Sequence, residues 1–303
     1  MKQSKGKTVI VVLGPTGVGK TYISIHLAQL FNCPIISSDS RQFYGELKIG
    51  TAVPSEEQLK IVKHYFIGSH SIFDKYNAGQ FEIDVLQLLD QLFEKNNTVL
   101  LVGGSMMYID AVCNGMDNIP EISAETRLKW TEIYKDKGLE YCQEELKKLD
   151  PDHYKIVNLK NPKRVLHALE VCTESGKTYT EFRKGVRKIR PFNIVKIGLN
   201  RTRTELYERI NYRVDEMLND GLLSEAEPFY KYRTLNTLNT VGYKEVYQYM
   251  DGKISYESAV EMIKQNTRRY AKRQLTWFGK DSEITWFHPD QEEEILNHLK
   301  KIL

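Results

Sequence analysis

Residues 14–21 have the types and the spacing that bind a phosphate group. Their sequence, GPTGVGKT, matches the pattern G-x-x-x-x-G-K-[ST] in full. Glycines let backbone N–H groups turn toward phosphate oxygens, Lys20 adds a mobile positive charge, and the Thr21 hydroxyl suits Mg²⁺. The alternative is a plain glycine turn between a strand and a helix. The predicted phosphate-binding residues are Gly14, Pro15, Thr16, Gly17, Val18, Gly19, Lys20 and Thr21.

Asp39 is the acidic residue that we expect beside this loop. It follows a short apolar segment, 34–37, which has the pattern of a buried strand. The carboxyl ends of parallel strands form the ligand crevice of an α/β fold, so Asp39 is predicted to face that crevice. The apolar segment 98–102 ends in Gly103 and Gly104 and has no acid there. The alternative role for Asp39 is a helix N-cap or an Asx turn.

Arg209 and Arg213 are four residues apart in a segment with helical spacing, 204–219. Side chains at this separation share one helix face, and two guanidinium groups there have the geometry to clamp phosphate oxygens. The alternative is a solvated face on which these arginines pair with Glu205 and Glu208.

A second helical segment, Tyr256–Phe278, carries a stripe of positive charge and ends in Trp277 and Phe278. Basic side chains beside aromatic ones suit phosphate contacts and base stacking in RNA, whereas a merely solvated helix face is the alternative. Residues 163–164 and 183–188 form further basic spots. The cations of the stripe are Lys264, Arg268, Arg269, Lys272 and Arg273.

The elements that must position these residues alternate between strands and helices. Apolar, β-branched runs predict buried strands, and apolar residues at helical spacing predict helices between them. This order predicts a parallel sheet with right-handed crossovers. The predicted strands are Thr8–Leu13, 34–37, 98–102, Asn193–Leu199 and 283–287. The predicted helices are 22–31, 78–95, 124–137, 139–149, 162–174, 204–219, 223–231, Tyr243–Met250, Tyr256–Phe278 and one at the C-terminus.

Residues 115–190 interrupt this pattern, because they contain amphipathic helices and no convincing strand. We therefore predict an α/β fold with a P-loop NTPase-like parallel-sheet core, a helical insertion domain and a helical C-terminal part. The core domain comprises 1–114 and 191–303, and the insertion domain comprises 115–190.

The composition is that of an ordinary globular protein, with 303 residues, 41% of them hydrophobic, and a formal net charge of +3. This small charge means that a nucleic-acid surface must come from local clusters of Lys and Arg. No signal peptide and no apolar run long enough for a membrane span is evident, so we expect a cytoplasmic protein. Nothing indicates an obligate oligomer, so we expect a monomer. The four cysteines are expected to be reduced, and the seven histidines lack zinc-site spacing.

Several blocks of the sequence, in order and over almost the whole length, resemble the tRNA dimethylallyltransferases, also called tRNA isopentenyltransferases. Val53 stands where the family commonly has Lys, and GGSMMY where it has GGTGLY, which bears on fine substrate preference. The matching blocks are GPTGVGKT, SSDSRQFYGELKIGTAVP (37–54), LLVGGSMMY (100–108), NPKRVLHALEV (161–171), SGKTYTEF (175–182), LYERINYRVDEML (206–218), TVGYKE (240–245) and TRRYAKRQLTWF (267–278).

The resemblance implies transfer of a dimethylallyl group from dimethylallyl diphosphate to the N6 amine of an adenine in tRNA. The adenine lies 3′ of the anticodon, in tRNAs that read codons beginning with U, and the products are N6-dimethylallyladenosine and diphosphate. The resemblance also implies a channel between core and insertion, into which the anticodon stem-loop flips the adenine while the prenyl diphosphate enters from the other end. Mg²⁺ is the expected cofactor, with Thr21 as its ligand.

The resemblance also assigns site residues. Asp39 is expected to accept the amine proton, because the delocalised lone pair makes adenine a weak nucleophile. The other expected catalytic residues are Lys20, Thr21, Arg209 and Arg213. The expected tRNA contacts are Asp39, Ser40, Arg41, Gln42, Ser105, Arg127, Lys163, Arg164, Val165, Leu166, His167, Gly242, Tyr243, Lys244, Arg268, Lys272 and Arg273.

Two other functions remain open from the sequence. A small-molecule P-loop kinase would turn over ATP and usually has an arginine-rich lid over the phosphates. A non-catalytic RNA-binding ATPase module would bind tRNA without forming a covalent product.

Overall fold

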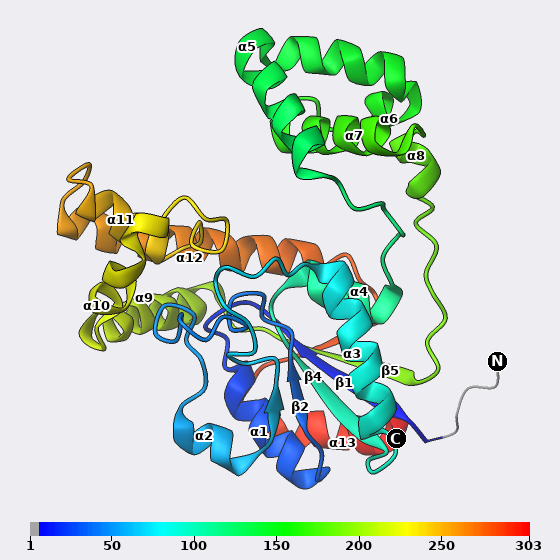
Figure 1. The fold of residues 1–303 in the computed structure, drawn as a ribbon. Helices are drawn as coiled ribbons and strands as arrows, with labels where there is room; N and C mark the ends of the chain where they lie inside the picture. The colour runs from blue at the N-terminus through cyan, green and yellow to red at the C-terminus, as the bar shows by residue number, and fades with distance from the viewer. Residues whose placement is uncertain (1–5) are drawn as a thin grey trace. The chain divides into compact units, whose positions relative to one another are not determined.

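The computed structural model describes residues 6–303, and its centre is a six-stranded parallel sheet (Figure 1). The strand order is β3-β2-β4-β1-β5-β6, so the first strand is flanked by partners on both sides. This arrangement confirms the predicted P-loop NTPase-like parallel-sheet core. The strands are β1 (Thr8–Leu13), β2 (Ile35–Ser37), β3 (His64–Tyr65), β4 (Thr98–Gly103), β5 (Asn193–Leu199) and β6 (Ile284–Phe287).

Helices fill most of the remaining chain. One prediction is wrong: 223–231 is not a single helix, because α10 ends at Ala226 and a 3₁₀ turn, Glu227–Tyr232, follows. Pro228 has no N–H to continue the α-helical hydrogen bonds. The helices are α1 (Lys20–Leu30), α2 (Glu56–Ile61), α3 (Ala78–Leu92), α4 (Met106–Asn114), α5 (Ala124–Leu149), α6 (Pro151–Ile156), α7 (Pro162–Ser175), α8 (Tyr179–Phe182), α9 (Arg203–Asn219), α10 (Leu222–Ala226), α11 (Tyr243–Met250), α12 (Tyr256–Phe278) and α13 (Glu292–Ile302).

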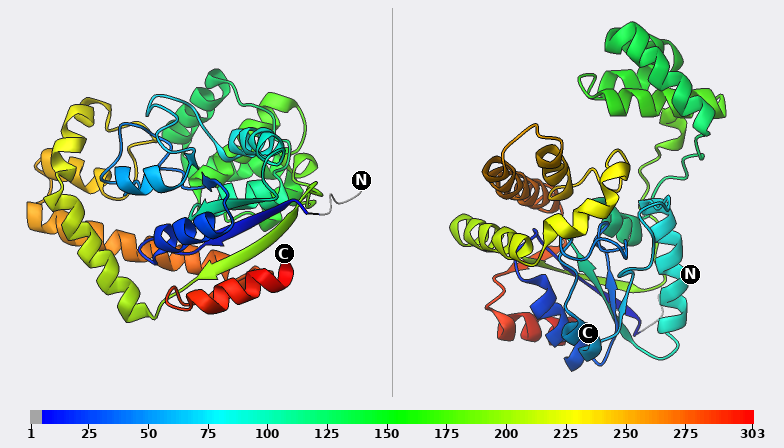
Figure 2. Two further views of the ribbon diagram at one scale, coloured as in Figure 1. Left: turned by 90° about the horizontal axis from the view of Figure 1, so that it is seen from below. Right: turned by 60° about the vertical axis from the view of Figure 1, so that its left-hand side comes forward.

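Helices cover both faces of the sheet, which explains why β1 is apolar along its whole length (Figure 2). Ile10 and Val12 pack in a core cluster with residues of α1, α9 and α13. Val9 and Val11 point to the opposite face and pack with residues of α3 and α4. The sheet therefore holds the loop after β1 between two packed layers.

The chain forms two compact units, of which the first comprises 6–113 with Ile189–Leu303 and the second comprises Asn114–Lys188. The second unit is all helical and has its own core, which includes Trp130, Leu146 and Leu169. Its helix α5 is broken at Gly138, whose φ of 78° is left-handed. Within 6–303, no helix is both long and apolar enough to cross a membrane.

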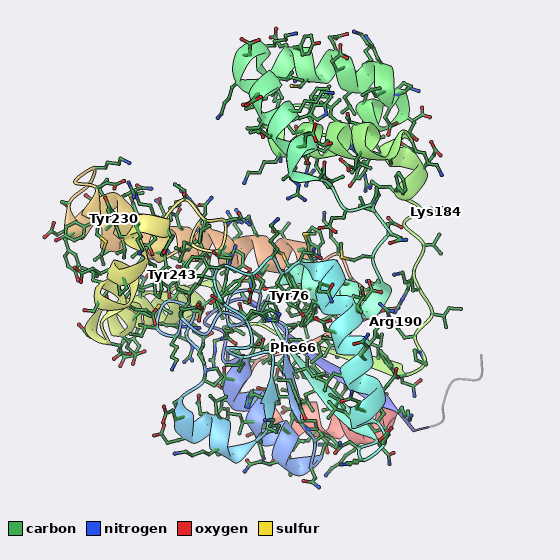
Figure 3. The ribbon with its side chains drawn as sticks, in the orientation of Figure 1. Phe66, Tyr76, Lys184, Arg190, Tyr230 and Tyr243 are labelled. Atoms are coloured by element: carbon green, nitrogen blue, oxygen red, sulfur yellow. The ribbon has the colours of Figure 1, made fainter. Side chains whose placement is uncertain are left out.

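A third apolar cluster joins α9, α10, α11 and α12 in the first unit. Tyr243, which begins α11, is fully buried in this cluster (Figure 3). These helices lie next to the segment that follows β2, because Tyr44 and Leu47 belong to the same cluster. The cluster thus packs these helices against the segment that leaves the carboxyl end of β2.

Candidate active site

The predicted phosphate-binding loop joins the end of β1 to the start of α1. Gly17 and Gly19 have φ of 80° and 113°, which residues with side chains rarely adopt. Gly14 lies so close to β5 that an added Cβ would be 2.5 Å from the Leu199 carbonyl oxygen. Gly19 has no side chain to cap α1, so the first-turn N–H groups are available to an anion. The loop therefore has the geometry of an anion cradle.

Lys20 lies folded over this loop. Its Nζ donates to the carbonyl oxygens of Gly14 and Pro15, at 3.0 and 2.9 Å. Burial lowers the pKa of Lys20 to about 8; the positive charge of Arg213 adds to this effect, and the negative charge of Asp39 opposes it. The loop thus holds a cation whose charge a bound phosphate would stabilise.

Asp39 follows β2, and its Oδ1 accepts the N–H of Arg41 at 3.0 Å. This hydrogen bond makes the Asx turn that the sequence left as an alternative. The carboxylate also faces the site, because Asp39 lines a cavity of about 380 Å³ and its charge raises the pKa of both Lys20 and Arg213. The turn therefore fixes the direction of the carboxylate and does not remove it from the site.

The cavity belongs to the first unit and has two kinds of wall. Charged and hydroxyl groups come from the phosphate-binding loop, the loop after β2, α9, α11 and α12. Apolar side chains come mainly from α9, α12 and the loop before α11. The polar lining includes Thr16, Asp39, Ser40, Arg41, Thr51, Arg213, Lys244, Thr267, Tyr270 and Arg273, and the apolar lining includes Ile210, Val214, Met217, Val241 and Ile263.

The two arginines of α9 both reach this region. Arg209 donates from Nε to the Gly17 carbonyl oxygen at 3.0 Å, so it contacts the phosphate-binding loop directly. Arg213 lines the cavity, and burial lowers its pKa. Glu205, one of the two alternative partners, instead accepts the N–H of Thr202 and caps α9. The structure therefore brings both arginines beside Lys20 and Asp39.

A hydroxyl network supports the β2 loop. Ser105 is buried; its Oγ accepts the N–H of Ser40 at 2.8 Å and donates to the Ser40 hydroxyl at 3.0 Å. Tyr270 of α12 shares a hydrogen bond with Ser105, and burial together with the Asp39 charge raises the pKa of Tyr270 to about 12. Gln42 donates to the carbonyl oxygens of Thr51 and Ala52. Ser105 and Gln42 thus shape the cavity from behind.

Glu225 of α10 anchors the cavity floor, a role that the sequence did not reveal. Its carboxylate accepts the N–H groups of Lys48, Ile49 and Gly50 at 2.7–3.0 Å. The Tyr243 hydroxyl also donates to Glu225. Tyr243 is one of the predicted tRNA contacts, but its side chain is fully buried and its hydroxyl is used here. Its neighbours Gly242 and Lys244 do line the cavity.

The basic stripe of α12 divides between two environments. Lys264 forms an ion pair with Asp215 of α9 at 2.7 Å, and Arg268 donates to Asn211 of the same helix. Lys272 and Arg273 are exposed, and Arg273 lies over the Tyr270 ring at 5.6 Å. Lys264 and Arg268 are therefore engaged with α9, whereas the cations nearer the end of α12 are exposed to solvent.

The remaining predicted tRNA contacts belong to the second unit. Arg127 on α5 and Lys163 with Arg164 on α7 are exposed. His167 is half-exposed and lies 3.7 Å from Glu170, and Leu166 is half-buried. The side chain of Val165, also a predicted contact, is fully buried in the core of this unit.

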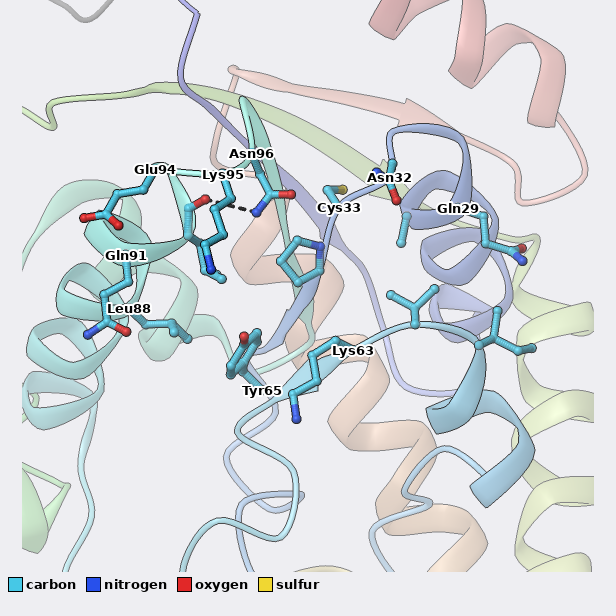
Figure 4. Close-up of a pocket in the computed structure, with 15 residues that line it drawn as sticks. Gln29, Asn32, Cys33, Lys63, Tyr65, Leu88, Gln91, Glu94, Lys95 and Asn96 are labelled. Atoms are coloured by element: carbon cyan, nitrogen blue, oxygen red, sulfur yellow. Dashed lines mark hydrogen bonds between the residues drawn. The ribbon is translucent and has the colours of Figure 1, made fainter.

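A larger cavity of about 920 Å³ lies where β2 begins (Figure 4), at the opposite end of the strands from the phosphate-binding loop. Lys63, Tyr65 and Asn96 border it, and Asn96 donates to the Leu92 carbonyl oxygen at 3.0 Å. Cys33 also lines it, but burial raises the pKa of this thiol to about 12 and keeps it protonated. The loop, the acid and the arginines are all elsewhere, so this cavity is not the candidate site.

The residues at the loop are compatible with Mg²⁺ bound through a phosphate group. Within 6–303, His, Cys, Asp and Glu form no group of three that could hold a metal ion alone. Mg²⁺ commonly takes one or two protein ligands together with substrate phosphates and water. Thr21, half-exposed in the first turn of α1, offers a hydroxyl oxygen of the required type.

Sequence reasoning missed three residues that organise this site: Tyr270, Glu225 and Gln274, whose amide hydrogen-bonds to Thr16 of the phosphate-binding loop and to Gly104 after β4. Gln274 carried a signal, because it falls at the spacing of the buried Ala271 and Phe278 on α12. An amide on an otherwise apolar face indicates a buried polar partner. Glu225 carried no comparable signal in a short polar segment.

Comparisons with known proteins agree with this geometry. The sequence profile of the family described as IPP transferase matches residues 42–281. A relative from Bacteroides fragilis, tRNA dimethylallyltransferase 1, is 58% identical over 294 residues, covering 97% of this chain and 98% of its own. The solved tRNA isopentenylpyrophosphate transferase from Bacillus halodurans is similar with a TM-score of 0.72 and 33% identity, covering 98% of this chain and 96% of its own. A solved eukaryotic dimethylallyltransferase acting on tRNA is similar with a TM-score of 0.77 and 26% identity, covering 93% of this chain and 74% of its own.

Proposed function

The chain belongs to the IPP transferase family, the tRNA dimethylallyltransferases, and we propose that the 380 Å³ cavity is where it transfers a dimethylallyl group to tRNA. The donor is dimethylallyl diphosphate, and the acceptor is the N6 amine of the adenine 3′ of the anticodon. The tRNAs are those that read codons beginning with U. The products are N6-dimethylallyladenosine and diphosphate.

One observation supports this assignment above all: the phosphate-binding loop, a fixed carboxylate and an apolar wall meet at one cavity. Thr16 is the loop residue that lines it, Asp39 supplies the carboxylate, and α9 supplies both Arg213 and the apolar Ile210 and Val214. A prenyl diphosphate has a charged end and a hydrocarbon end, so it needs both kinds of wall. A small-molecule kinase does not need the apolar one.

The reaction breaks the bond between the first carbon of the dimethylallyl group and a diphosphate oxygen. Lys20, Arg209 and Arg213 stabilise the negative charge that builds up on the departing diphosphate. The apolar side chains of α9 and α12 exclude water, which would otherwise capture the allyl cation. The adenine amine bonds to the same carbon, and its proton passes to Asp39.

Mg²⁺ is part of this proposal, with Thr21 as its protein ligand. When bound, it supplies positive charge to the diphosphate oxygens and makes the diphosphate a better leaving group. The protein's own cations share this task, since Lys20 already lies over the loop.

The tRNA partner is proposed to bind through its anticodon stem-loop. Ser40, Arg41, Gly242, Lys244 and Arg273 line the cavity and are the proposed contacts near the reacting base. Exposed cations of the second unit, Arg127, Lys163 and Arg164, are proposed contacts elsewhere on the stem-loop. We propose that the protein acts as a monomer in the cytoplasm, where it meets its tRNA.

Release of diphosphate tests this function. The protein is incubated with dimethylallyl diphosphate and Mg²⁺, with and without unmodified tRNA, and free diphosphate is measured. We expect release only with tRNA, in proportion to the tRNA added. Consumption of ATP with a small-molecule acceptor, and no release from dimethylallyl diphosphate, would favour a kinase instead.

A further inference from the structure

We infer that Gln274 of α12 is a positioning residue that holds the phosphate-binding loop in its working shape. Gln274 is buried, with 1% of the residue's surface exposed. Its Oε1 accepts the N–H of Thr16 at 2.9 Å, and its Nε2 donates to the Gly104 carbonyl oxygen at 2.8 Å. One side chain thus ties the loop after β1 to the end of β4.

The packing around Gln274 leaves no room for a side chain at Gly104. A Cβ added to Gly104 would lie 2.3 Å from Nε2 of Gln274 and 3.1 Å from the Gly14 carbonyl oxygen. The start of the loop, the end of β4 and the amide therefore meet at van der Waals distance. This contact gives a physical reason for glycine after β4, where many P-loop proteins carry an acid.

Gln274 also links the loop to the helix that lines the cavity. Tyr270 and Arg273, on the preceding turn of α12, belong to the cavity wall, as does Thr16 itself. Because the Thr16 N–H is held by Gln274, the groups that meet a phosphate come from later positions of the loop. The amide therefore sets where the anion cradle lies relative to the cavity, and touches neither substrate.

This inference rests on the proposed function only for the identity of the ligand, so inorganic diphosphate is the probe. Gln274→Leu keeps the approximate size of the side chain and removes both hydrogen bonds, leaving a partly buried N–H and a buried carbonyl unsatisfied. We expect diphosphate binding, measured by calorimetry, to weaken about tenfold or more. Affinity for tRNA, measured separately without diphosphate, is expected to change less than about twofold.

A matched control lies on the same helix. Gln265 is exposed, so Gln265→Leu makes the same chemical change away from the loop. It is expected to leave both affinities unchanged. If folded Gln274→Leu binds diphosphate as tightly as the natural protein, or loses diphosphate and tRNA binding equally, the positioning role is wrong.

Gln274→Glu provides a second test that does not depend on the stability of the leucine variant. An ionised carboxylate can still accept the Thr16 N–H but repels the Gly104 carbonyl oxygen, whereas a protonated carboxyl has one acceptor and one donor, as the amide does. Diphosphate affinity relative to the natural protein should therefore be lowest at high pH and recover as pH falls, because burial raises the pKa of the new carboxyl group. A ratio that does not change with pH would overturn the inference. A natural protein that binds diphosphate but modifies no tRNA would instead overturn the proposed function alone.

Discussion

Lys20 and Asp39 are held in place by different means, and the difference determines how each responds to its surroundings. Lys20 lies on two loop carbonyls and its pKa is lowered to about 8 by burial, so its charge depends on pH near neutrality. Asp39 is fixed by a hydrogen bond from its own turn and faces two cations, Lys20 and Arg213. Lys20 was predictable from the G-x-x-x-x-G-K-[ST] pattern, and Asp39 from its place after a short apolar segment, 34–37.

The pKa of Lys20 leads to a prediction about diphosphate binding. Below a pH of about 8 the free protein carries Lys20 as a cation, and above it Lys20 is neutral. Since diphosphate binds the cation, affinity should fall as pH rises from about 7 to about 9, by up to about tenfold per pH unit above the pKa. Calorimetric titration with inorganic diphosphate measures this slope. Lys20→Met should bind diphosphate weakly, and its affinity should depend little on pH. A natural protein whose diphosphate affinity does not change across this range would contradict the prediction.

Asp39→Asn tests the proposed base. The substitution keeps the size of the side chain and its ability to accept the Arg41 N–H, but an amide cannot take the amine proton. Single-turnover transfer at saturating substrates should slow by about a hundredfold or more. Diphosphate affinity should stay nearly normal, because a carboxylate does not bind a phosphate directly.

A metal-binding role for Asp39 would give a different result. The variant would need more Mg²⁺, and added Mg²⁺ would restore the rate. A near-normal rate in Asp39→Asn would leave this residue as a turn-former.

At the scale of elements, α12 performs three tasks on different faces. Lys264 and Arg268 bind α9, Gln274 holds the phosphate-binding loop, and Lys272 with Arg273 face solvent. The sequence showed one continuous basic stripe because helical spacing alone does not reveal which neighbour each face has. The partner of Gln274 in the loop is 258 positions away along the chain.

This division predicts which cations of α12 contribute to tRNA binding. Replacing both Lys272 and Arg273 with alanine should weaken tRNA binding. The slope of log affinity against log salt should become less steep by about 1.5, because binding releases fewer counterions when two phosphate contacts are lost. Filter binding across a salt series measures the slope. Lys264→Ala is the control, because Lys264 is already paired with Asp215. Equal slopes in all three proteins would show that the exposed cations are merely solvated.

The elements that the sequence predicted well are those with long, regular patterns, such as Thr8–Leu13 and Tyr256–Phe278, whose bounds are confirmed. The sequence did not reveal β3, which pairs over only two residues, His64 and Tyr65. So short a strand depends on the hydrogen bonds that β2 supplies, and it has no pattern of its own in the sequence. Glu225 was hidden for the same reason, since its partners are 175–177 positions away.

At the scale of the whole molecule, the two segments of the first unit contact each other at the point where the second unit begins and ends. Arg190 donates from Nε to the Val112 carbonyl oxygen at 2.7 Å and forms an ion pair with Glu82 at 2.9 Å (Figure 3). The core clusters of the first unit contain no residue of 114–188. The sequence placed the insertion at 115–190, and the second unit spans Asn114–Lys188.

These observations predict that the first unit folds without the second. Replacing 115–187 with a short glycine-serine linker costs little loop-closure entropy, because the ends of the first unit already meet. The shortened protein should unfold cooperatively and bind inorganic diphosphate with nearly natural affinity, but should not modify tRNA. Circular dichroism and calorimetry measure the first two properties. Loss of diphosphate binding would show that the units depend on each other, and retained transfer would remove the second unit from tRNA recognition.

The central claim is the transfer of a five-carbon unit to one adenine of tRNA, and mass spectrometry of the reacted tRNA tests it most directly. Unmodified tRNA that reads a codon beginning with U is incubated with the protein, dimethylallyl diphosphate and Mg²⁺, then digested to fragments and nucleosides. We predict that one adenosine gains the mass of a dimethylallyl group in place of a hydrogen, and that the fragment carrying it contains the position 3′ of the anticodon. An unchanged tRNA, or a prenylated nucleoside at another position, would contradict the account.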